Sequence, residues 1–219
     1  MTLLDFARGP ALEASLFIFV AGVIWRCVGT LLLPWRLVPV EPRKGASSPW
    51  VAALKGVLVK LWPYDTFAKS GVVQFVNGYI FHAGFAVVFL LFAPHILFIK
   101  GVTGLSWPSL PNNVIMMIGV VTAASLVVAL VFRVTSPVLR LISRVDDYIS
   151  WFLTFLPVAT GLMAAAHLGL RYETLLSLHI LSFCALLVWF PFGKLMHAFL
   201  FAFSRAVTGV RMGQRGAAI

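Results

Sequence analysis

Five histidines lie within or at the ends of strongly apolar stretches of this 219-residue chain, at positions 82, 95, 167, 179 and 197. Neutral imidazole is the commonest metal ligand among side chains, and it can also carry a proton near neutral pH. His179 and His197 are 18 residues apart, so on one continuous helix they would share a face and lie about 27 Å apart along its axis. Two haem groups stacked across a membrane would need this spacing from one shared ligand helix.

The composition predicts that these histidines lie in a membrane. The chain is 61% hydrophobic and only 11% charged, with a mean hydropathy of +0.98, whereas a soluble domain has about 45–50% apolar and about 25% charged residues. Lipid is therefore the expected solvent. The net charge of +10 comes from cations clustered between apolar runs, so topology explains it and nucleic acid is not an expected partner. Two cysteines are too few to ligate an iron–sulfur cluster.

Five stretches are long and apolar enough to cross a bilayer: about 12–34, 72–99, 114–132, 148–167 and 175–203. We expect an all-α membrane protein, a single domain over residues 1–219 that forms a bundle of five transmembrane helices. Residues 48–63 have an amphipathic pattern, which fits a helix at the membrane surface as well as a connecting helix packed on its own protein.

The distribution of cations predicts the orientation of the chain. The loop after the first span, the loop after the third span and the tail carry six, three and three Lys/Arg residues, whereas the other side has Arg8, Lys100 and Arg171. The positive-inside rule then places the N-terminus outside and the C-terminus in the cytoplasm. We expect a multi-pass protein of the prokaryotic cytoplasmic membrane.

This orientation decides which histidines can meet. The second and fifth spans are antiparallel, so His82 and His197 would share the cytoplasmic leaflet, and His95 and His179 the outer one. Each pair could hold one haem iron axially from two helices. A single intramembrane histidine is often a simple helix–helix contact, but four residues in two level-matched pairs favour haem ligation.

The stretch SLHILSFCALLVWFPFGKLMH, residues 177–197, resembles a helix of the membrane-bound respiratory nitrate reductase gamma subunit family, which is a dihaem cytochrome b. The family has two histidines at the spacing of His179 and His197, with Phe-Pro-Phe and a basic residue, here Lys194, before the second. IFHAGF around His82 and RVTSPVLR from Arg133 are similar to the family's first ligand site in the second span and to its loop after the third span. Cytochrome b subunits of heterodisulfide-reductase-like, sulfur-metabolising membrane complexes are similar as well.

The resemblance implies two b haems, a quinone or quinol as redox partner, and a larger complex with a cytoplasmic iron–sulfur subunit and a catalytic subunit. The chain itself has no motif for a terminal catalytic site. Electrons would cross the bilayer between quinol and the iron–sulfur subunit. Arg133 and Lys194 lie at the cytoplasmic ends of their spans and could pair with haem propionates, or act as snorkelling anchors. The terminal reaction, nitrate or sulfur chemistry, stays open.

One position departs from the family. Its second ligand in the second span falls ten residues after the first, which here is Phe92, whereas His95 comes 13 residues after His82 and is turned by about 140° from it on an ideal helix. Pro94 would free the carbonyl of Leu90 and kink the helix, which could turn His95 toward His179. The alternatives are His167 as the partner of His179, or a protein that keeps only the cytoplasmic haem.

A different class of function also fits the sequence. A haem-free membrane anchor, or a small transporter whose histidines bind protons or a metal ion, would carry the same apolar spans and intramembrane imidazoles. The outer group of His95, Lys100 and His167 could also border a quinone pocket, because a quinol site needs a proton acceptor beside an apolar slot.

Overall fold

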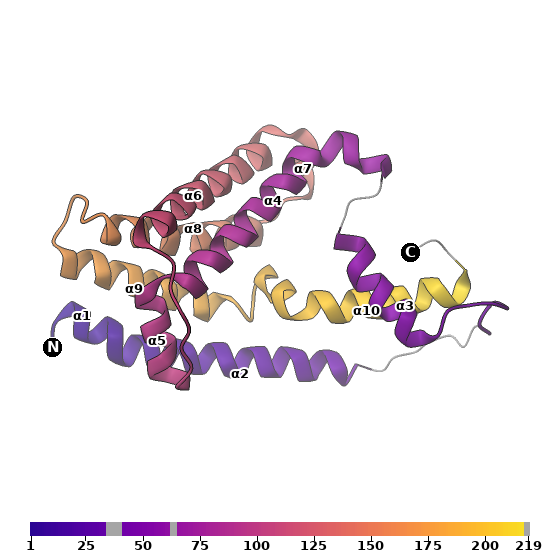
Figure 1. Ribbon diagram of the computed structural model, residues 1–219, viewed down its shortest axis with the longest axis horizontal. Coiled ribbons are helices and arrows are strands. Elements are labelled where there is room, and N and C mark those ends of the chain that lie inside the picture. The colour runs from indigo at the N-terminus through magenta and orange to yellow at the C-terminus, as the bar shows by residue number, and fades with distance from the viewer. Residues whose placement is uncertain (34–40, 62–64, 217–219) are drawn as a thin grey trace. The chain divides into compact units, whose positions relative to one another are not determined.

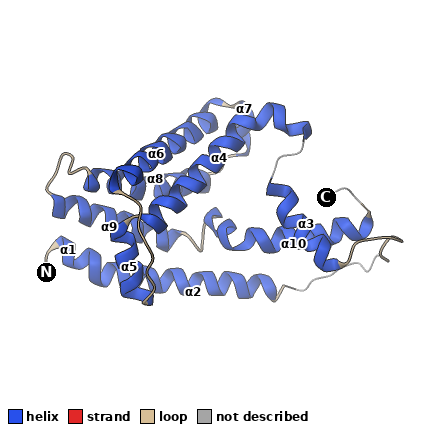
Figure 2. Ribbon diagram, in the orientation of Figure 1, coloured by secondary structure: helices blue, strands red, loops and turns tan. Residues whose placement is uncertain are grey.

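The computed structural model describes residues 1–33, 41–61 and 65–216 of the chain (Figure 1). Helices make up nearly all of this part, and none of the described residues forms a strand (Figure 2). The all-α class expected from the sequence is therefore confirmed.

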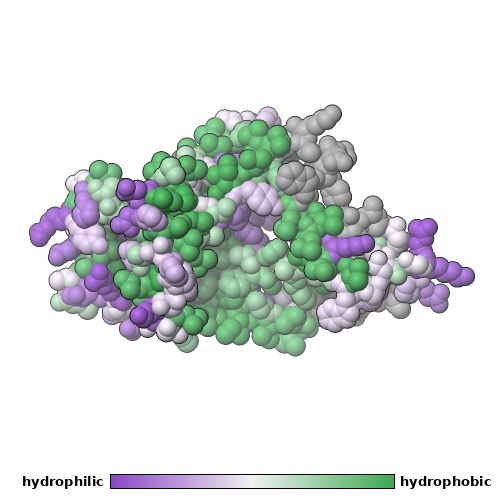
Figure 3. All heavy atoms as spheres, in the orientation of Figure 1, coloured by the Kyte–Doolittle hydropathy of each residue, from purple (hydrophilic) through white to green (hydrophobic). Residues whose placement is uncertain are grey.

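Five helical segments are long and apolar enough to cross a membrane: Leu3–Leu31, Gly71–Leu91, Asn112–Thr135, Val145–Ala165 and Tyr172–Trp189. Their apolar side chains reach the surface, and green, hydrophobic atoms cover much of the face shown in Figure 3. Because so much exposed apolar surface needs a non-aqueous solvent, the protein is a multi-pass membrane protein, and the expected number of spans is confirmed.

Residues 1–219, expected as one domain, divide into two compact units. The first unit, here called the histidine unit, comprises residues 1–19 and 73–189. The second, here called the basic unit, comprises residues 20–72 and 190–219.

The histidine unit begins with α1 (Leu3–Phe6), a π-helical turn (Ala7–Ala11) and the start of α2 (Leu12–Leu31). It continues through most of α4 (Asp65–Leu91) and then contains α5 (Ala93–Thr103), α6 (Asn112–Thr135), α7 (Pro137–Ile142), α8 (Val145–Ala165) and α9 (Tyr172–Trp189). Helix α8 packs on both α6 and α9, and the N-terminal turn packs on α9. The packed group around α8 positions the side chains considered below.

Small residues and polar side chains join the helices of this unit. Gly84 of α4 lies against the Thr122 hydroxyl of α6, where a larger residue would collide. Asn77 Nδ2 donates to the Ser125 carbonyl over 2.9 Å, and Trp151 Nε1 donates to the Leu126 carbonyl over 2.8 Å. Helices in lipid associate through such close packing and interhelical hydrogen bonds, since lipid offers no hydrophobic driving force between them.

The second expected span, 72–99, is interrupted. Helix α4 ends at Leu91, Phe92 has extended dihedrals (φ −82°, ψ 127°), and α5 starts again at Ala93 with Pro94 in its first turn. The last carbonyls of a helix have no intrahelical partners, and here Trp107 Nε1 donates to Leu90 over 2.6 Å and Leu110 N to Leu91 over 2.9 Å. The kink predicted from Pro94 is confirmed. The carbonyls of Leu90 and Leu91 that it frees accept hydrogen bonds from nearby residues.

The basic unit contains the rest of α2, helix α3 (Pro49–Leu58) with a 3₁₀ turn at Val59–Leu61, and α10 (His197–Arg215) after a 3₁₀ turn at Lys194–Met196. Helix α3 packs closely on α10. A Cβ on Gly56 would lie 2.5 Å from the Arg205 carbonyl oxygen and 2.6 Å from the Gly209 Cα. The two backbones can therefore meet only because both contact residues are glycines.

The expected continuous helix through residues 175–203 is wrong. Helix α9 ends at Trp189, the chain turns through Pro191 and an extended Gly193 (φ −96°, ψ −175°), and α10 begins at His197. Proline lacks the N–H that a helix interior needs, which explains the break. His179 and His197 thus do not share one helix face, and they belong to different units.

Other boundaries differ less from the expected ones. The first helical run begins at Leu3 rather than near residue 12, and its expected end at 34 lies outside the described residues. The amphipathic stretch 48–63 is helical from Pro49 and 3₁₀ to Leu61, with residues 62–63 outside the described part. The spans expected at 114–132 and 148–167 match α6 and α8 within three residues at each end.

Candidate functional site

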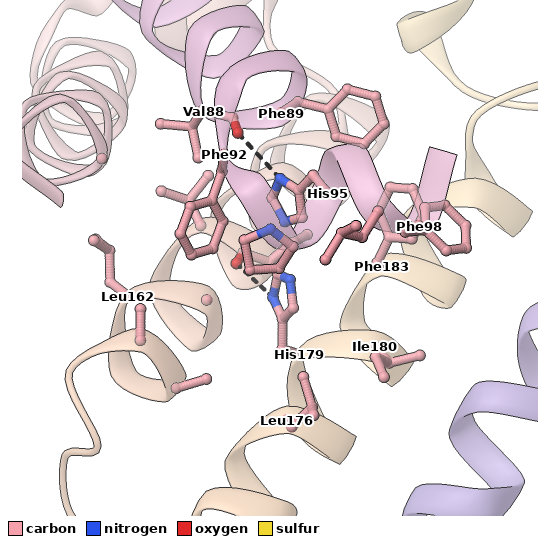
Figure 4. A pocket seen from close by; sticks show the side chains of 18 of the residues that line it. Val88, Phe89, Phe92, His95, Phe98, Leu162, Leu176, His179, Ile180 and Phe183 are labelled. Carbon is pink, nitrogen blue, oxygen red and sulfur yellow. Dashed lines mark hydrogen bonds between the residues drawn. The ribbon is translucent and has the colours of Figure 1, made fainter. Parts of the chain in front are cut away.

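His95 and His179 face each other inside the histidine unit, as Figure 4 shows. His95 comes from the first turn of α5 and His179 from α9. Their ring centres lie 6.0 Å apart and their planes differ by 17°. The break before Pro94 is what turns His95 to this side, so the structure brings together the pair predicted from the proline and from the membrane levels.

Each of these rings is held through Nδ1 by a backbone carbonyl. His95 Nδ1 lies 3.0 Å from the Val88 oxygen, a carbonyl that the end of α4 leaves available, and His179 Nδ1 lies 3.0 Å from the Pro157 oxygen of α8. A carbonyl only accepts hydrogen bonds, so the proton of a neutral ring must sit on Nδ1, and Nε2 then carries the lone pair. Metal-binding histidines are fixed in this way by their second nitrogen.

His179 lies directly on the backbone of α8. A Cβ on Gly161 would be 3.0 Å from His179 Cε1 and 3.2 Å from its Nδ1, so any other residue would require the ring to shift by a few tenths of an ångström. Thr160 Oγ1 lies 3.4 Å from His179 Nδ1 and 3.1 Å from Ser182 Oγ. The Ser182 hydroxyl in turn donates to the His179 carbonyl over 2.7 Å. Backbone and hydroxyl contacts therefore fix both the position and the orientation of this imidazole.

The two rings border a cavity of about 690 Å³. Phenylalanines form much of its wall: Phe85, Phe89, Phe92, Phe98 and Phe183. The Phe92 ring meets His95 edge-on with centres 5.3 Å apart, and the Phe89 ring lies 5.7 Å from His95 and 6.0 Å from Phe183 (Figure 4). Exposed Arg8 and Glu13 also line the cavity. It is thus an apolar space with two imidazoles inside and charges from the N-terminal segment.

The spacing of the rings would allow both imidazoles to bind one metal ion. A metal–imidazole bond is about 2 Å long, so two rings that share one ion place their centres about 6 Å apart. Within the described ranges, no three side chains of His, Cys, Asp or Glu gather as a metal site. A porphyrin would supply four nitrogens of its own, so its iron would need only two further ligands from the protein. Two imidazoles are therefore a donor set that a haem iron could take.

The other two predicted ligands have the same Nδ1 arrangement. His82 is exposed on α4 and its Nδ1 lies 2.6 Å from the Gly78 oxygen. His197 is exposed at the start of α10 and its Nδ1 lies 2.8 Å from the Lys194 oxygen. His82 belongs to the histidine unit and His197 to the basic unit, so their pairing stays a prediction.

His167, the competing partner for His179, is placed differently. It lies in the connection between α8 and α9 with a positive φ of 54°. Its ring stacks on Tyr172, with centres 5.0 Å apart and planes at 22°. It is His95 that the fold brings to His179.

The predicted propionate partners have other contacts. Arg133, in the last turn of α6, donates to Ser143 Oγ over 2.9 Å and lies 3.4 Å from Asp147 Oδ1 of α8. Its guanidinium therefore ties the end of α6 to the start of α8. Lys194 is exposed and opens the 3₁₀ turn before His197 in the basic unit. Lys100 is exposed in the last turn of α5.

The residues that hold His179 in place, Pro157 and Gly161, have no distinctive signal in the sequence. Pro157 and Gly161 stand four residues apart in an apolar run, a pattern that also occurs in ordinary transmembrane helices. The sequence predicts Arg8 only as a cation of the outer side, whereas the structure places it among the residues that line the cavity. Its position before Pro10 in the first helical run is the one sequence feature that could have indicated this.

Comparison with known proteins gives one informative relative. No family model matches this chain, and no solved structure matches it. A protein of Nitratidesulfovibrio vulgaris, strain Hildenborough, is 31% identical over 207 residues, which cover 94% of this chain and 91% of the relative. The chain belongs to the same family as this protein. The family relationship covers nearly the whole length of both proteins. The name of the relative states no activity, so a function for this chain has to be argued from its site.

Proposed function

We propose that this protein is a membrane cytochrome b that carries electrons across the bilayer. One b haem is held by His95 and His179, and a second by His82 and His197. The observation that carries the proposal is the His95–His179 pair, with ring centres 6.0 Å apart and each Nδ1 bonded to a backbone carbonyl. These hydrogen bonds leave the lone pair on Nε2 of both rings, which is the nitrogen that a haem iron would bind.

The surroundings of this pair support haem binding. A cavity of about 690 Å³ falls within the range of about 300–1,000 Å³ that is common for small-molecule and cofactor sites. Its phenylalanine walls keep water away, and the Nδ1–carbonyl bonds raise the basicity of the ligand nitrogens. Bound haem would supply reversible one-electron chemistry. The chain would contribute two imidazole nitrogens, their fixed orientation and the apolar surroundings that would tune the potential.

The cytoplasmic pair, His82 and His197, rests on membrane levels and on the family resemblance. Both rings hold Nδ1 against the carbonyl three or four residues earlier, which leaves Nε2 as the nitrogen with the lone pair. The positive-inside rule gives the orientation in which these two residues share the cytoplasmic leaflet, with the N-terminus outside and the C-terminus inside. We place the protein in the prokaryotic cytoplasmic membrane on the same ground.

The proposed path connects quinone with a soluble redox partner. Quinol or quinone exchanges electrons at the outer site, and an iron–sulfur subunit with a catalytic subunit does so at the basic cytoplasmic side. The chain contains two cysteines, Cys27 and Cys184, which are too few for a cluster of its own. Nitrate reduction and sulfur or heterodisulfide chemistry are both compatible with this arrangement.

An absorption spectrum of the purified, dithionite-reduced protein tests the proposal. We expect a Soret band, a split b-type α band and two haem equivalents per chain. His95→Ala and His179→Ala should each remove one equivalent, while the matched control His167→Ala should retain both. A protein without a Soret band would instead be a haem-free anchor or a small proton or metal transporter. Full haem content in His95→Ala would show that His95 is not a haem ligand.

Reduction by quinol tests the other half of the path. A menaquinol or ubiquinol analogue should reduce haem in the parent protein. Failure of both analogues would refute the quinone link even where haem is present.

A further inference from the structure

The net charge of the chain is concentrated in one unit. Residues 20–72 and 190–219 hold eleven Lys/Arg against two Asp/Glu, a net charge of +9 out of the +10 of the whole chain. The histidine unit is nearly neutral although it is the larger of the two. The positive-inside rule explains why cations gather on one side of a membrane, but not what the surface that carries them binds.

Helix α3 in this basic unit has an apolar stripe without a protein partner among the described residues. Trp50, Leu54 and Leu58 follow one another every four residues and are 86%, 61% and 54% exposed, and Val51 widens the stripe. The opposite side of α3, with Ala52 and Gly56, is buried on α10. Residues four apart lie on the same helix face. The small residues of α3 therefore pack on α10, and its large apolar residues face outward.

This helix is too short to span a bilayer. Ten α-helical residues cover about 15 Å, against a hydrocarbon thickness of about 30 Å. An exposed apolar face on such a helix, with a tryptophan at its start, is typical of a segment that lies in the membrane interface. Acyl chains would cover the stripe, and the helix axis would run along the surface.

Cations border this stripe. Lys55 is exposed on α3 itself, and Arg43 and Lys44 are exposed in the segment just before it. That segment is tied to the end of α10, because Arg43 N donates to the Gln214 carbonyl over 3.0 Å. Exposed Arg211 and Arg215 follow on α10. The Gly56–Gly209 contact therefore joins two helices that carry exposed cations from distant parts of the chain.

We infer that α3 and α10 together form a binding surface for anionic phospholipid. The stripe of Trp50, Leu54 and Leu58 lies among acyl chains, and the flanking lysines and arginines bind anionic headgroups. An apolar stripe alone would fit a protein as well, but the charge of +9 matches the negative surface potential of a cytoplasmic leaflet. The partner is an anionic bilayer surface.

Lipid selectivity in a reconstituted bilayer tests the headgroup half of this inference. The full chain is placed in phosphatidylcholine vesicles with spin-labelled phosphatidylglycerol or phosphatidylcholine, and the relative association of the two labels is measured. We expect a preference for phosphatidylglycerol, which Lys44→Gln/Lys55→Gln lowers about two- to fivefold because each cation near the surface contributes to binding. The charge-matched control Arg140→Gln/Arg144→Gln, from exposed positions of the histidine unit, should keep the preference of the parent.

A nitroxide label tests the acyl-chain half. Attached at Leu54→Cys, it should relax more with oxygen than with a water-soluble nickel chelate, whereas the same label at Lys55→Cys, one residue away at the edge of the stripe, should favour the chelate. The unsubstituted protein gives the background of Cys27 and Cys184. A label at Leu54→Cys that favours the chelate would assign the stripe to a soluble protein partner and overturn the inference. Equal loss of lipid preference in the control pair would overturn it as well.

Discussion

The ring of His179 lies on the one position of α8 that has no side chain: a Cβ on Gly161 would come within 3.0 Å of its Cε1 atom. Contacts this close require the ring to move by a few tenths of an ångström. We expect Gly161→Ala to weaken haem binding at the outer site, seen as loss of part of one haem equivalent or as a changed low-spin signal in electron paramagnetic resonance.

The control for this variant is Gly29→Ala, because a Cβ on Gly29 meets nothing within 4 Å. Alanine favours a helix over glycine by about 1 kcal/mol, so neither variant should lose its helix. A native spectrum in Gly161→Ala would show that haem binding by His179 does not depend on the space that Gly161 leaves beside its ring.

Pro94 should be needed to present His95. Pro94→Ala restores an N–H in the first turn of α5 and lets α4 continue past Phe92, which would rotate His95 away from Val88 and His179. We expect loss of the outer haem, measured by the reduced spectrum. Pro157→Ala is the matched control, since the carbonyl of residue 157 that receives His179 Nδ1 belongs to the backbone and survives the substitution. Loss of haem in the control alone would contradict this account.

Arg133 is expected to act in packing. Its ion pair with Asp147 is partly exposed, with side chains 32% and 12% accessible, so Arg133→Gln should lower the free energy of unfolding by about 1 kcal/mol or less. Haem content and midpoint potentials should not change. If Arg133 paired with a propionate instead, removal of its positive charge would lower the potential of one haem, which redox titration would detect.

Close packing of α4 on α6 should be sensitive to volume. Gly84→Val brings a branched side chain against Thr122, where even a Cβ collides. Overpacking of this kind costs roughly 1–3 kcal/mol, and we expect a lower unfolding temperature in detergent. Gly78→Val, on the same helix with open space around its Cβ, should cost only the lower helix propensity of valine. If both variants lowered the unfolding temperature equally, the Gly84–Thr122 contact would not be the cause of the effect.

The sequence predicted the features that depend on local chemistry. Apolar length gave the five spans, and Pro94 predicted both the break in the second span and the turn of His95 toward His179. The break at Pro191 and Gly193 was equally visible, but the helical spacing of His179 and His197 suggested a continuous helix. The seat formed by Pro157 and Gly161 could not be predicted, because it depends on which face of α8 meets α9, and apolar runs alone do not specify that face.

The end of α4 beside His95 also has an electrical consequence. Aligned peptide dipoles leave about half a negative elementary charge at the carboxyl end of a helix, and the break at Phe92 puts that end where the Val88 carbonyl meets His95. The amino end of α5 brings a partial charge of opposite sign to the same place, because His95 lies in the first turn of that helix. Oxidised haem iron carries one more positive charge than reduced iron, so the two helix ends would act on the potential of the outer haem in opposite directions. The proline that breaks the helix thereby brings a negative and a positive helix end to one imidazole.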